Sequence, residues 1–339
     1  MLIAALLSAS PAAPAKLVTG LVAPTLTPFH ANGTVALAGV DRQANFLQAT
    51  NVSWVFCSGT TGESVDLTVA ERKLIAERWM ALSKKSGAFR VIVHVGAESI
   101  VDTKEMAAHA ESLGAHAIAA MPPTFIKPTS LDALVATYAA IGSSAPKTPL
   151  FYYHIPTKTG VDFLMADFLA AAGPKIPTLT GIKFTDVNLQ DLNEALHVDG
   201  GRFNILYGRD QQLLSAAILG VDGAVGSTYN FLGETMGLVL APFAAGGSGD
   251  VSAAALELAR TVQLSNARLI SIVVDWTNGV GAGANWIKET ENLVAVATGP
   301  PRLPYLEATP AARAALASAL KGWCAELNGA ARPSWCAKL

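Results

Sequence analysis

Lys183 stands in the segment GIKFTD (181–186), between Ile182 and Phe184, where branched and aromatic residues predict a β-strand. Successive side chains of a strand point to opposite faces, so Ile182 and Phe184 share one face and Lys183 has the other. A lysine in a dry cleft has a lowered pKa, and its neutral amine can attack a ketone to form a Schiff base. A lysine in a strand usually extends its ammonium group to solvent instead. The interpretation of Lys183 as a Schiff-base nucleophile therefore requires partner residues that could take part in the reaction.

Candidate partners follow other apolar runs of the chain. Tyr152 and Tyr153 end the segment PLFYYHIP, and alternation lets only one of them face the side of Lys183, where its hydroxyl could move a proton. The segment GTTG (59–62) offers two hydroxyls and closely spaced backbone N–H groups, which are suited to a carboxylate. The segment GST, with Ser227, could add a further hydroxyl.

Other site chemistries lack support in the sequence. The six histidines form no HExxH or similar metal-binding pattern, and His154 is interpreted as a structural neighbour of the tyrosines. A GxSxG elbow, a P-loop and a dinucleotide-binding fingerprint are all missing. We therefore expect neither a metal nor a cofactor.

The elements that must position these residues are eight short apolar runs. They are nearly continuous rather than alternating, as in strands buried on both faces of a parallel sheet, and their spacing is typical of repeated βα units. The runs cover residues 21–29, 54–59, 91–96, 117–121, 149–156, 180–186, 203–208 and 223–228.

Helical patterns lie between these runs. The clearest begins at Thr68, where TVAE is a capping-box signature with Glu71 at its third position. Eight strands each followed by a helix predict a (β/α)8 barrel, a TIM barrel of the α/β class. A doubly wound open sheet is the alternative, but GLVAPTLTPF lacks the glycine-rich fingerprint that usually follows its first strand. Further helices are expected at 38–50, 99–114, 130–142, 162–173, 189–197, 210–220 and 234–245.

A single barrel domain is expected over residues 17–328. Its last part, about 250–328, is rich in additional C-terminal helices, and TGPPRLP (298–304) forms a loop within it. Residues 1–16 have an apolar, signal-like run without a basic residue before it, which we interpret as a disordered extension. Residues 329–339 form a tail.

Composition limits the possible partners. Of 339 residues, 51% are hydrophobic and 15% charged, the formal net charge is −2, and the pI is about 6.3. Nucleic acids and anionic membranes are therefore disfavoured, because both require a basic face. Cys57, Cys324 and Cys336 show no metal-ligand spacing, which favours a reducing compartment and a cytoplasmic protein. Cys324 and Cys336 are close enough in sequence to leave a bridge open.

The segments GTTGES, YYHIP, GIKFTD, YGRD and GSTYN, in this order, resemble the N-acetylneuraminate lyase branch of the dihydrodipicolinate synthase-like aldolases. The resemblance covers residues 17–320. It implies a (β/α)8 barrel with extra C-terminal helices, a homotetramer, and a Schiff-base lysine that works without metal or cofactor. The implied reaction is the reversible retro-aldol cleavage of N-acetylneuraminate, a sialic acid, to N-acetylmannosamine and pyruvate.

The resemblance also implies a role for each matching residue. Lys183 would form the Schiff base, Tyr153 would transfer the proton, and Thr60 and Thr61 would bind the pyruvate carboxylate. The residues that would line the sugar side are Thr185, Gly208, Asp210, Gln211 and Ser227.

Three positions depart from the lyase pattern. Gln211 stands where these lyases usually have a glutamate, and Lys158 where they usually have an aliphatic residue. The related synthases have an arginine at the position of Lys158, and at Phe125 a tyrosine lent by the next subunit. The alternative is a related pyruvate-dependent aldolase or synthase, either dihydrodipicolinate synthase-like or a keto-deoxy-sugar-acid aldolase. A non-catalytic barrel that binds a 2-oxo acid is a further alternative.

Overall fold

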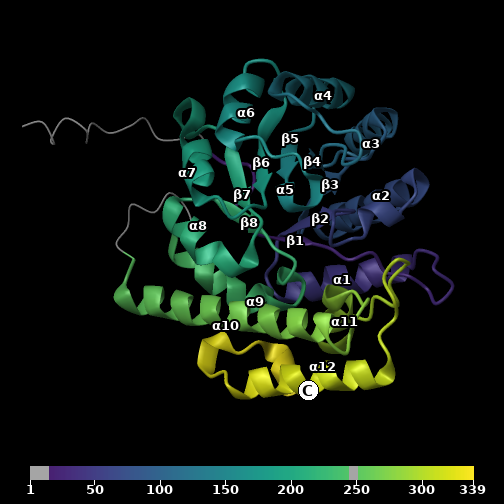
Figure 1. The fold of residues 1–339 in the computed structure, drawn as a ribbon, viewed down its shortest axis with the longest axis vertical. Helices are drawn as coiled ribbons and strands as arrows, with labels where there is room; N and C mark the ends of the chain where they lie inside the picture. The colour runs from purple at the N-terminus through teal and green to yellow at the C-terminus, as the bar shows by residue number, and fades with distance from the viewer. Residues whose placement is uncertain (1–14, 244–250) are drawn as a thin grey trace, which may run out of the picture.

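A computed structural model describes residues 15–243 and 251–339, and it shows a closed barrel of parallel strands surrounded by helices (Figure 1). The strands pair in sequence order, and β1 closes the barrel against β8. This closure confirms the predicted (β/α)8 fold class and excludes the open-sheet alternative. The strands are β1 (Gly20–Pro24), β2 (Trp54–Cys57), β3 (Arg90–His94), β4 (Ala117–Ala120), β5 (Leu150–His154), β6 (Leu179–Phe184), β7 (Asn204–Tyr207) and β8 (Gly223–Val225).

The helices alternate with the strands and then continue beyond the barrel. The helix predicted from Thr68 has the expected capping box, in which the Thr68 side chain accepts from Glu71 N while the Glu71 side chain accepts from Thr68 N. The helices are α1 (Leu37–Ala49), α2 (Val69–Ser86), α3 (Ile100–Ser112), α4 (Leu131–Ser144), α5 (Pro156–Thr159), α6 (Met165–Ala172), α7 (Leu189–His197), α8 (Leu213–Leu219), α9 (Tyr229–Leu240), α10 (Ala253–Asn278), α11 (Trp286–Val294) and α12 (Pro310–Ala325).

Two helices differ from the sequence prediction. Helix α9 begins at Tyr229, five residues before the predicted start at 234, and a kink at Leu232 (φ −119°, ψ 17°) separates its first turn from the rest. Phe231 and Leu232 are buried against the barrel, and this packing stabilises the additional turn. The short helix α5 was not predicted. It begins at Pro156, a residue that is well accommodated in the first turn of a helix.

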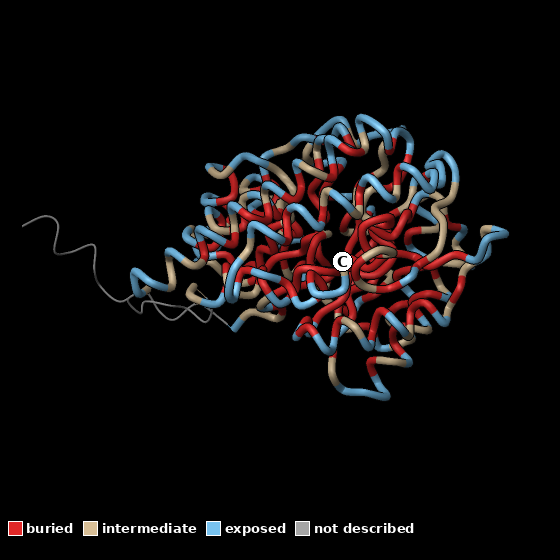
Figure 2. Tube along the Cα trace, turned by 90° about the horizontal axis from the view of Figure 1, so that it is seen from below, coloured by how far each residue is buried: buried red, intermediate tan, exposed pale blue. Residues whose placement is uncertain are grey.

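Buried residues form two apolar clusters, one inside the barrel and one between the strands and the helices. The interior cluster includes Phe56, Phe151 and Tyr153, whereas the outer cluster includes Ile182 and Phe184. Figure 2 shows the buried residues gathered in the middle of the molecule beneath an exposed outer layer. Alternation along each strand therefore sends neighbouring side chains to different clusters.

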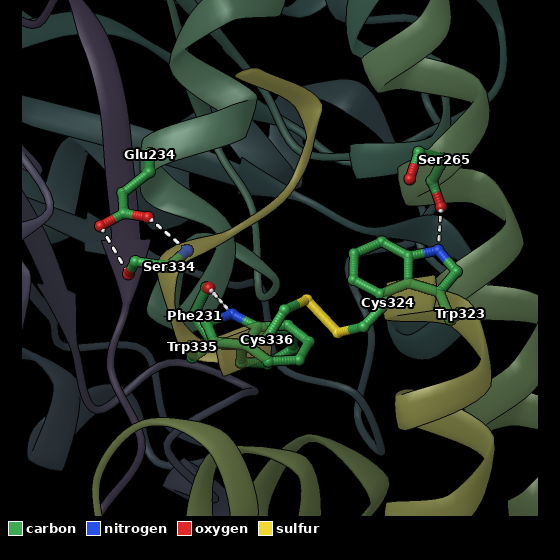
Figure 3. The surroundings of a disulfide bond; sticks show 8 residues. All are labelled: Phe231, Glu234, Ser265, Trp323, Cys324, Ser334, Trp335 and Cys336. Carbon is green, nitrogen blue, oxygen red and sulfur yellow. Dashed lines mark hydrogen bonds between the residues drawn. A yellow bond between two sulfur atoms is a disulfide. The ribbon is translucent and has the colours of Figure 1, made fainter. Parts of the chain in front are cut away.

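The C-terminal helices pack beside the barrel, and the tail folds back onto them (Figure 1). A disulfide joins Cys324, near the end of α12, to Cys336, so the bridge that the sequence left open is present (Figure 3). Trp335 Nε1 donates a hydrogen bond to the Phe231 carbonyl at 2.6 Å, which fixes the tail on α9. Cys57 is a buried free thiol.

The first described residues hold the start of the described chain against the barrel. The expected extension at 1–16 lies outside the described residues except for its last two, of which Lys16 donates through Nζ to the Phe203 carbonyl at 2.8 Å. Among the described helices, none combines the length and apolar character that crossing a bilayer requires.

Candidate active site

Lys183 lies in the interior of the barrel, near the C-terminal end of β6. It pairs in register with Tyr153 of β5, and its Nζ is 3.8 Å from the centroid of the Tyr153 ring and 4.2 Å from that of the Phe56 ring. Only 4% of the residue is exposed. Ile182 and Phe184 are fully buried on the opposite face of the strand, as the alternation predicted.

Burial lowers the pKa of Lys183 to about 7, and the nearby carboxylate of Asp210 opposes this shift. Removing an ammonium from water disfavours its charged form, and two aromatic faces compensate only partly. A large fraction of the amine is therefore neutral near neutral pH. This is the form that attacks a carbonyl.

The reactivity of Lys183 should follow its titration. The rate of borohydride trapping with subsaturating pyruvate should fall about tenfold for each pH unit below about 7, because protonation removes the nucleophile. Above that pH, the rate should level off. Trapping rates measured from pH 5 to 9 would check this, and a midpoint near 10 would show that Lys183 is not desolvated.

Tyr153 faces the same interior as Lys183, whereas Tyr152 faces the helices. The Tyr153 hydroxyl is 3.1 Å from Thr60 Oγ1, and burial raises its pKa to about 12, which the Thr60 hydroxyl opposes. Tyr153 is therefore protonated at neutral pH, and a hydroxyl in this state can serve as a relay by giving up its own proton as it accepts another. The buried Tyr152 hydroxyl has no hydrogen-bond partner among the described residues.

The GTTG turn follows β2 and reaches across the barrel mouth. Besides the Thr60 contact with Tyr153, Thr61 Oγ1 is 2.8 Å from Ser227 Oγ, which lies just after β8. These two contacts bring the turn, β5 and the end of β8 together around one space. Hydroxyls and backbone N–H groups arranged in this way are suited to a carboxylate.

The predicted sugar-side residues lie in different environments. Thr185 and Gly208 touch, since a Cβ at Gly208 would lie 2.0 Å from Thr185 Oγ1, so only glycine fits there. The Thr185 hydroxyl also lowers the pKa of Tyr153, although it has no hydrogen-bond partner of its own within the described ranges. Gln211 is exposed.

Asp210 is more enclosed than a sugar-binding carboxylate on the rim would be. It is 6% exposed, and its Oδ2 accepts from Thr228 N at 2.8 Å and from Thr228 Oγ1 at 2.6 Å. Burial raises its pKa, while the bonds from Thr228 oppose that shift. Its charge therefore acts on Lys183 from inside the barrel.

Sequence reasoning missed two residues around this site. Phe56 provides one of the aromatic faces beside Lys183, and His94 packs edge-on against Tyr153 with 5.8 Å between ring centroids. His94 Nδ1 is 2.8 Å from the Ser58 carbonyl and its Nε2 accepts from Met121 N at 3.2 Å. Burial holds the His94 pKa well below its usual value. Both residues lie in predicted strands, so applying the same alternation rule there would have found them.

One group of side chains could hold a cation, but it lies outside the barrel interior. Ligand atoms of His154, Asp162 and Asp186 are within 4.8 Å of one another. The His154 ring packs against Tyr152 and Phe184, on the helix-facing side of the sheet. A cation there would be separated from Lys183 by the strands.

Comparisons with known proteins agree with this geometry. The model of the dihydrodipicolinate synthetase family matches residues 17–322. The chain is 39% identical to N-acetylneuraminate lyase of Gallus gallus over 298 residues, which cover 87% of this chain and 93% of the relative. It is 38% identical to the Homo sapiens N-acetylneuraminate lyase over 301 residues, covering 87% and 89%. The solved N-acetylneuraminate lyase of Proteus mirabilis superposes with a TM-score of 0.80 at 32% identity, covering 90% of this chain and 98% of that one.

Proposed function

The chain belongs to the dihydrodipicolinate synthetase family, and we propose that it is a class I aldolase that reversibly cleaves N-acetylneuraminate to N-acetylmannosamine and pyruvate. One observation carries the mechanism: the desolvated amine of Lys183 faces the hydroxyl-bearing ring of Tyr153 inside the barrel mouth. The substrate is proposed from the relatives, which are named for this reaction.

The first half of the reaction prepares an electron sink. The neutral Lys183 amine attacks the C2 ketone of the open-chain sugar acid, and loss of water gives a protonated imine. Thr60 and Thr61 hold the neighbouring carboxylate, so that the new C=N bond is aligned with the bond to be broken.

The second half breaks the C3–C4 bond. Tyr153 accepts the C4 hydroxyl proton while passing its own proton to the substrate carboxylate, the electrons of the C3–C4 bond move into the imine, and N-acetylmannosamine leaves as the aldehyde. The remaining enamine takes up at C3 the proton held by the carboxyl group, which returns through Tyr153. Water then hydrolyses the imine, which releases pyruvate and restores Lys183.

The sugar side of the site is proposed to consist of Thr185, Gly208, Asp210, Gln211 and Ser227, with enclosed Asp210 acting from beneath the others through its bonds with Thr228. The neutral amide of exposed Gln211 would contact the glycerol end of the substrate as both donor and acceptor. Lys158, in α5, is also exposed. The alternative, a synthase-like aldolase for a second carboxylate-bearing substrate, would use Lys158.

We further propose a homotetramer. Phe125 and Ile126, after β4, are 89% and 81% exposed, and a neighbouring subunit would cover apolar surface of this kind. A cavity of about 360 Å³ lies nearby, lined by Val65, Met121 and Thr124 among others. The disulfide argues against the cytoplasmic location that the cysteine pattern predicted, because such bonds persist mainly in oxidising compartments.

Reductive trapping tests the mechanism. Incubation with pyruvate and borohydride, followed by peptide mass mapping, should find the pyruvate-derived adduct on Lys183 and none on Lys175, whose side chain is 59% exposed. An unmodified Lys183 at saturating pyruvate would contradict the mechanism.

Two assays then identify the second substrate. The enzyme should cleave N-acetylneuraminate and should not condense pyruvate with aspartate semialdehyde. Turnover of aspartate semialdehyde alone would replace the proposed substrate. Pyruvate binding without turnover of either substrate would favour a keto-deoxy-sugar-acid aldolase or a non-catalytic barrel.

A further inference from the structure

A buried ion pair lies directly beside the turn that carries Thr60 and Thr61. Glu63 follows this turn, and its Oε1 accepts a hydrogen bond from Lys288 Nζ of α11 at 2.5 Å. The Glu63 side chain is 1% exposed and that of Lys288 is fully buried. The reaction described above uses neither residue. Two charges withdrawn from water in this way depend strongly on each other.

The pair connects the turn to two distant parts of the chain. Lys288 Nζ also donates to the Thr27 carbonyl at 2.8 Å, and Thr27 Oγ1 donates to the Gly62 carbonyl at 2.7 Å. On its other side, Glu63 Oε2 accepts from Arg302 N at 3.2 Å. The last residues of the turn are therefore held from the loop after β1, from α11 and from the segment that follows α11.

The backbone of the turn requires such support. Glu63 has φ 59°, a left-handed conformation that is unfavourable for a residue with a side chain, and its N–H donates to the Thr60 carbonyl at 3.1 Å. A Cβ at Gly62 would lie 2.8 Å from the Thr25 carbonyl, so the turn packs tightly against backbone. Releasing the Glu63 carboxylate would therefore let the strained residue relax and would move Thr60 and Thr61 with it.

We propose that the Glu63–Lys288 ion pair positions the GTTG turn for the carboxylate of the 2-oxo acid. Both are positioning residues, since they act through Thr60 and Thr61 and do not touch substrate. The inference rests on the proposed function and deepens it. It assigns recognition of the carboxylate to a contact between the barrel mouth and a C-terminal helix.

The test compares pyruvate with its neutral isostere pyruvamide in borohydride trapping of Lys183. In Glu63→Gln and in Lys288→Met, the pyruvate concentration for half-maximal trapping should rise by about ten- to a hundredfold, because small displacements of binding groups have effects of this size. The pyruvamide concentration for half-maximal trapping should change little, since pyruvamide has no carboxylate for the turn to hold.

The double variant E63Q/K288M separates positioning from stability. It should regain most of the Tm lost in the single variants, because no unpaired charge remains buried. It should still lack the preference for pyruvate. A double variant that recovers both properties would overturn the proposal.

Arg313→Met provides a matched control. Arg313 of α12 pairs with Glu289 at 2.9 Å, and Glu289 is a buried residue of α11, next to Lys288 in the chain. This pair joins α11 to α12 and does not contact the turn. The Arg313→Met variant should lower the Tm without changing the ratio of the half-maximal trapping concentrations of pyruvate and pyruvamide. A similar ratio change in this control, or equal weakening of pyruvate and pyruvamide in Lys288→Met, would show that the pair is merely structural.

A milder variant tests the proposal even if the charge variants do not fold. Thr27→Val removes the hydroxyl that donates to the Gly62 carbonyl. It should raise the pyruvate concentration for half-maximal trapping, by a smaller factor than the charge variants do. An unchanged value would overturn the proposal. If the wild type and all variants trap pyruvate equally well, only this inference fails and the proposed function stands. If the wild type forms no adduct, the proposed function fails and takes the inference with it.

Discussion

Lys183→Met should lower kcat for N-acetylneuraminate cleavage by about 10⁴-fold or more, because the imine that accepts the electrons cannot form without the Lys183 amine. Methionine keeps the unbranched apolar body of the side chain and is one heavy atom shorter. Its sulfur would take the place of the lysine Cδ and its methyl group that of Cε, so the end of the side chain would still approach the Phe56 and Tyr153 rings that contact Nζ, and sulfur packs well against aromatic rings. The fold should therefore survive, and the Tm should stay the same or rise, since a buried amine has been removed. Steady-state kinetics and a thermal melt measure both effects.

The matched control for this variant is Lys175→Met, which removes a solvent-exposed lysine. Its kcat should equal that of the wild type. If Lys183→Met retained more than about a tenth of the wild-type kcat, covalent catalysis by this residue would be wrong. Loss of activity together with a collapsed Tm would instead indicate a structural role.

Tyr153→Phe should lower kcat by about 10²- to 10⁴-fold, the range typical of losing a positioned proton-transfer group. The ring that packs against Lys183 remains, so pyruvate trapping by borohydride should persist. Chemistry after imine formation would then be slowed selectively. Comparing kcat with the trapping rate in one preparation tests this separation.

Tyr152 provides a control on the adjacent position of the same strand. Its hydroxyl is buried on the helix-facing side and has no hydrogen-bond partner within residues 15–243 and 251–339. Tyr152→Phe should leave kcat unchanged and should stabilise the fold slightly, because an unsatisfied buried hydroxyl is lost. Equal loss of kcat in the two variants would contradict the assignment of the relay to Tyr153.

The side that each strand residue faces could be predicted from the sequence. Alternation is a property of the extended backbone itself, so Ile182 and Phe184 were enough to send Lys183 inward. Repeated βα spacing similarly predicted the barrel, because parallel strands need long crossover connections. The start of α9 at Tyr229 was missed, since burial of Phe231 stabilises a first turn that a kink at Leu232 separates from the rest of the helix.

Distances between strands were decided only by the tertiary structure. The contact of Thr61 with Ser227 depends on closure of the barrel, and the salt bridge of Glu63 with Lys288 depends on where α11 packs. The pKa of Lys183 depends in the same way on aromatic rings from two other strands.

The sequence by itself thus determined which residue types reach the barrel mouth, because covalent geometry sets the direction of each side chain. The folded chain decided which of those side chains meet and how dry their surroundings are. Lys183 shows the division: its inward direction follows from two neighbours in the chain, whereas its pKa of about 7 follows from desolvation by residues that only the closed barrel brings near.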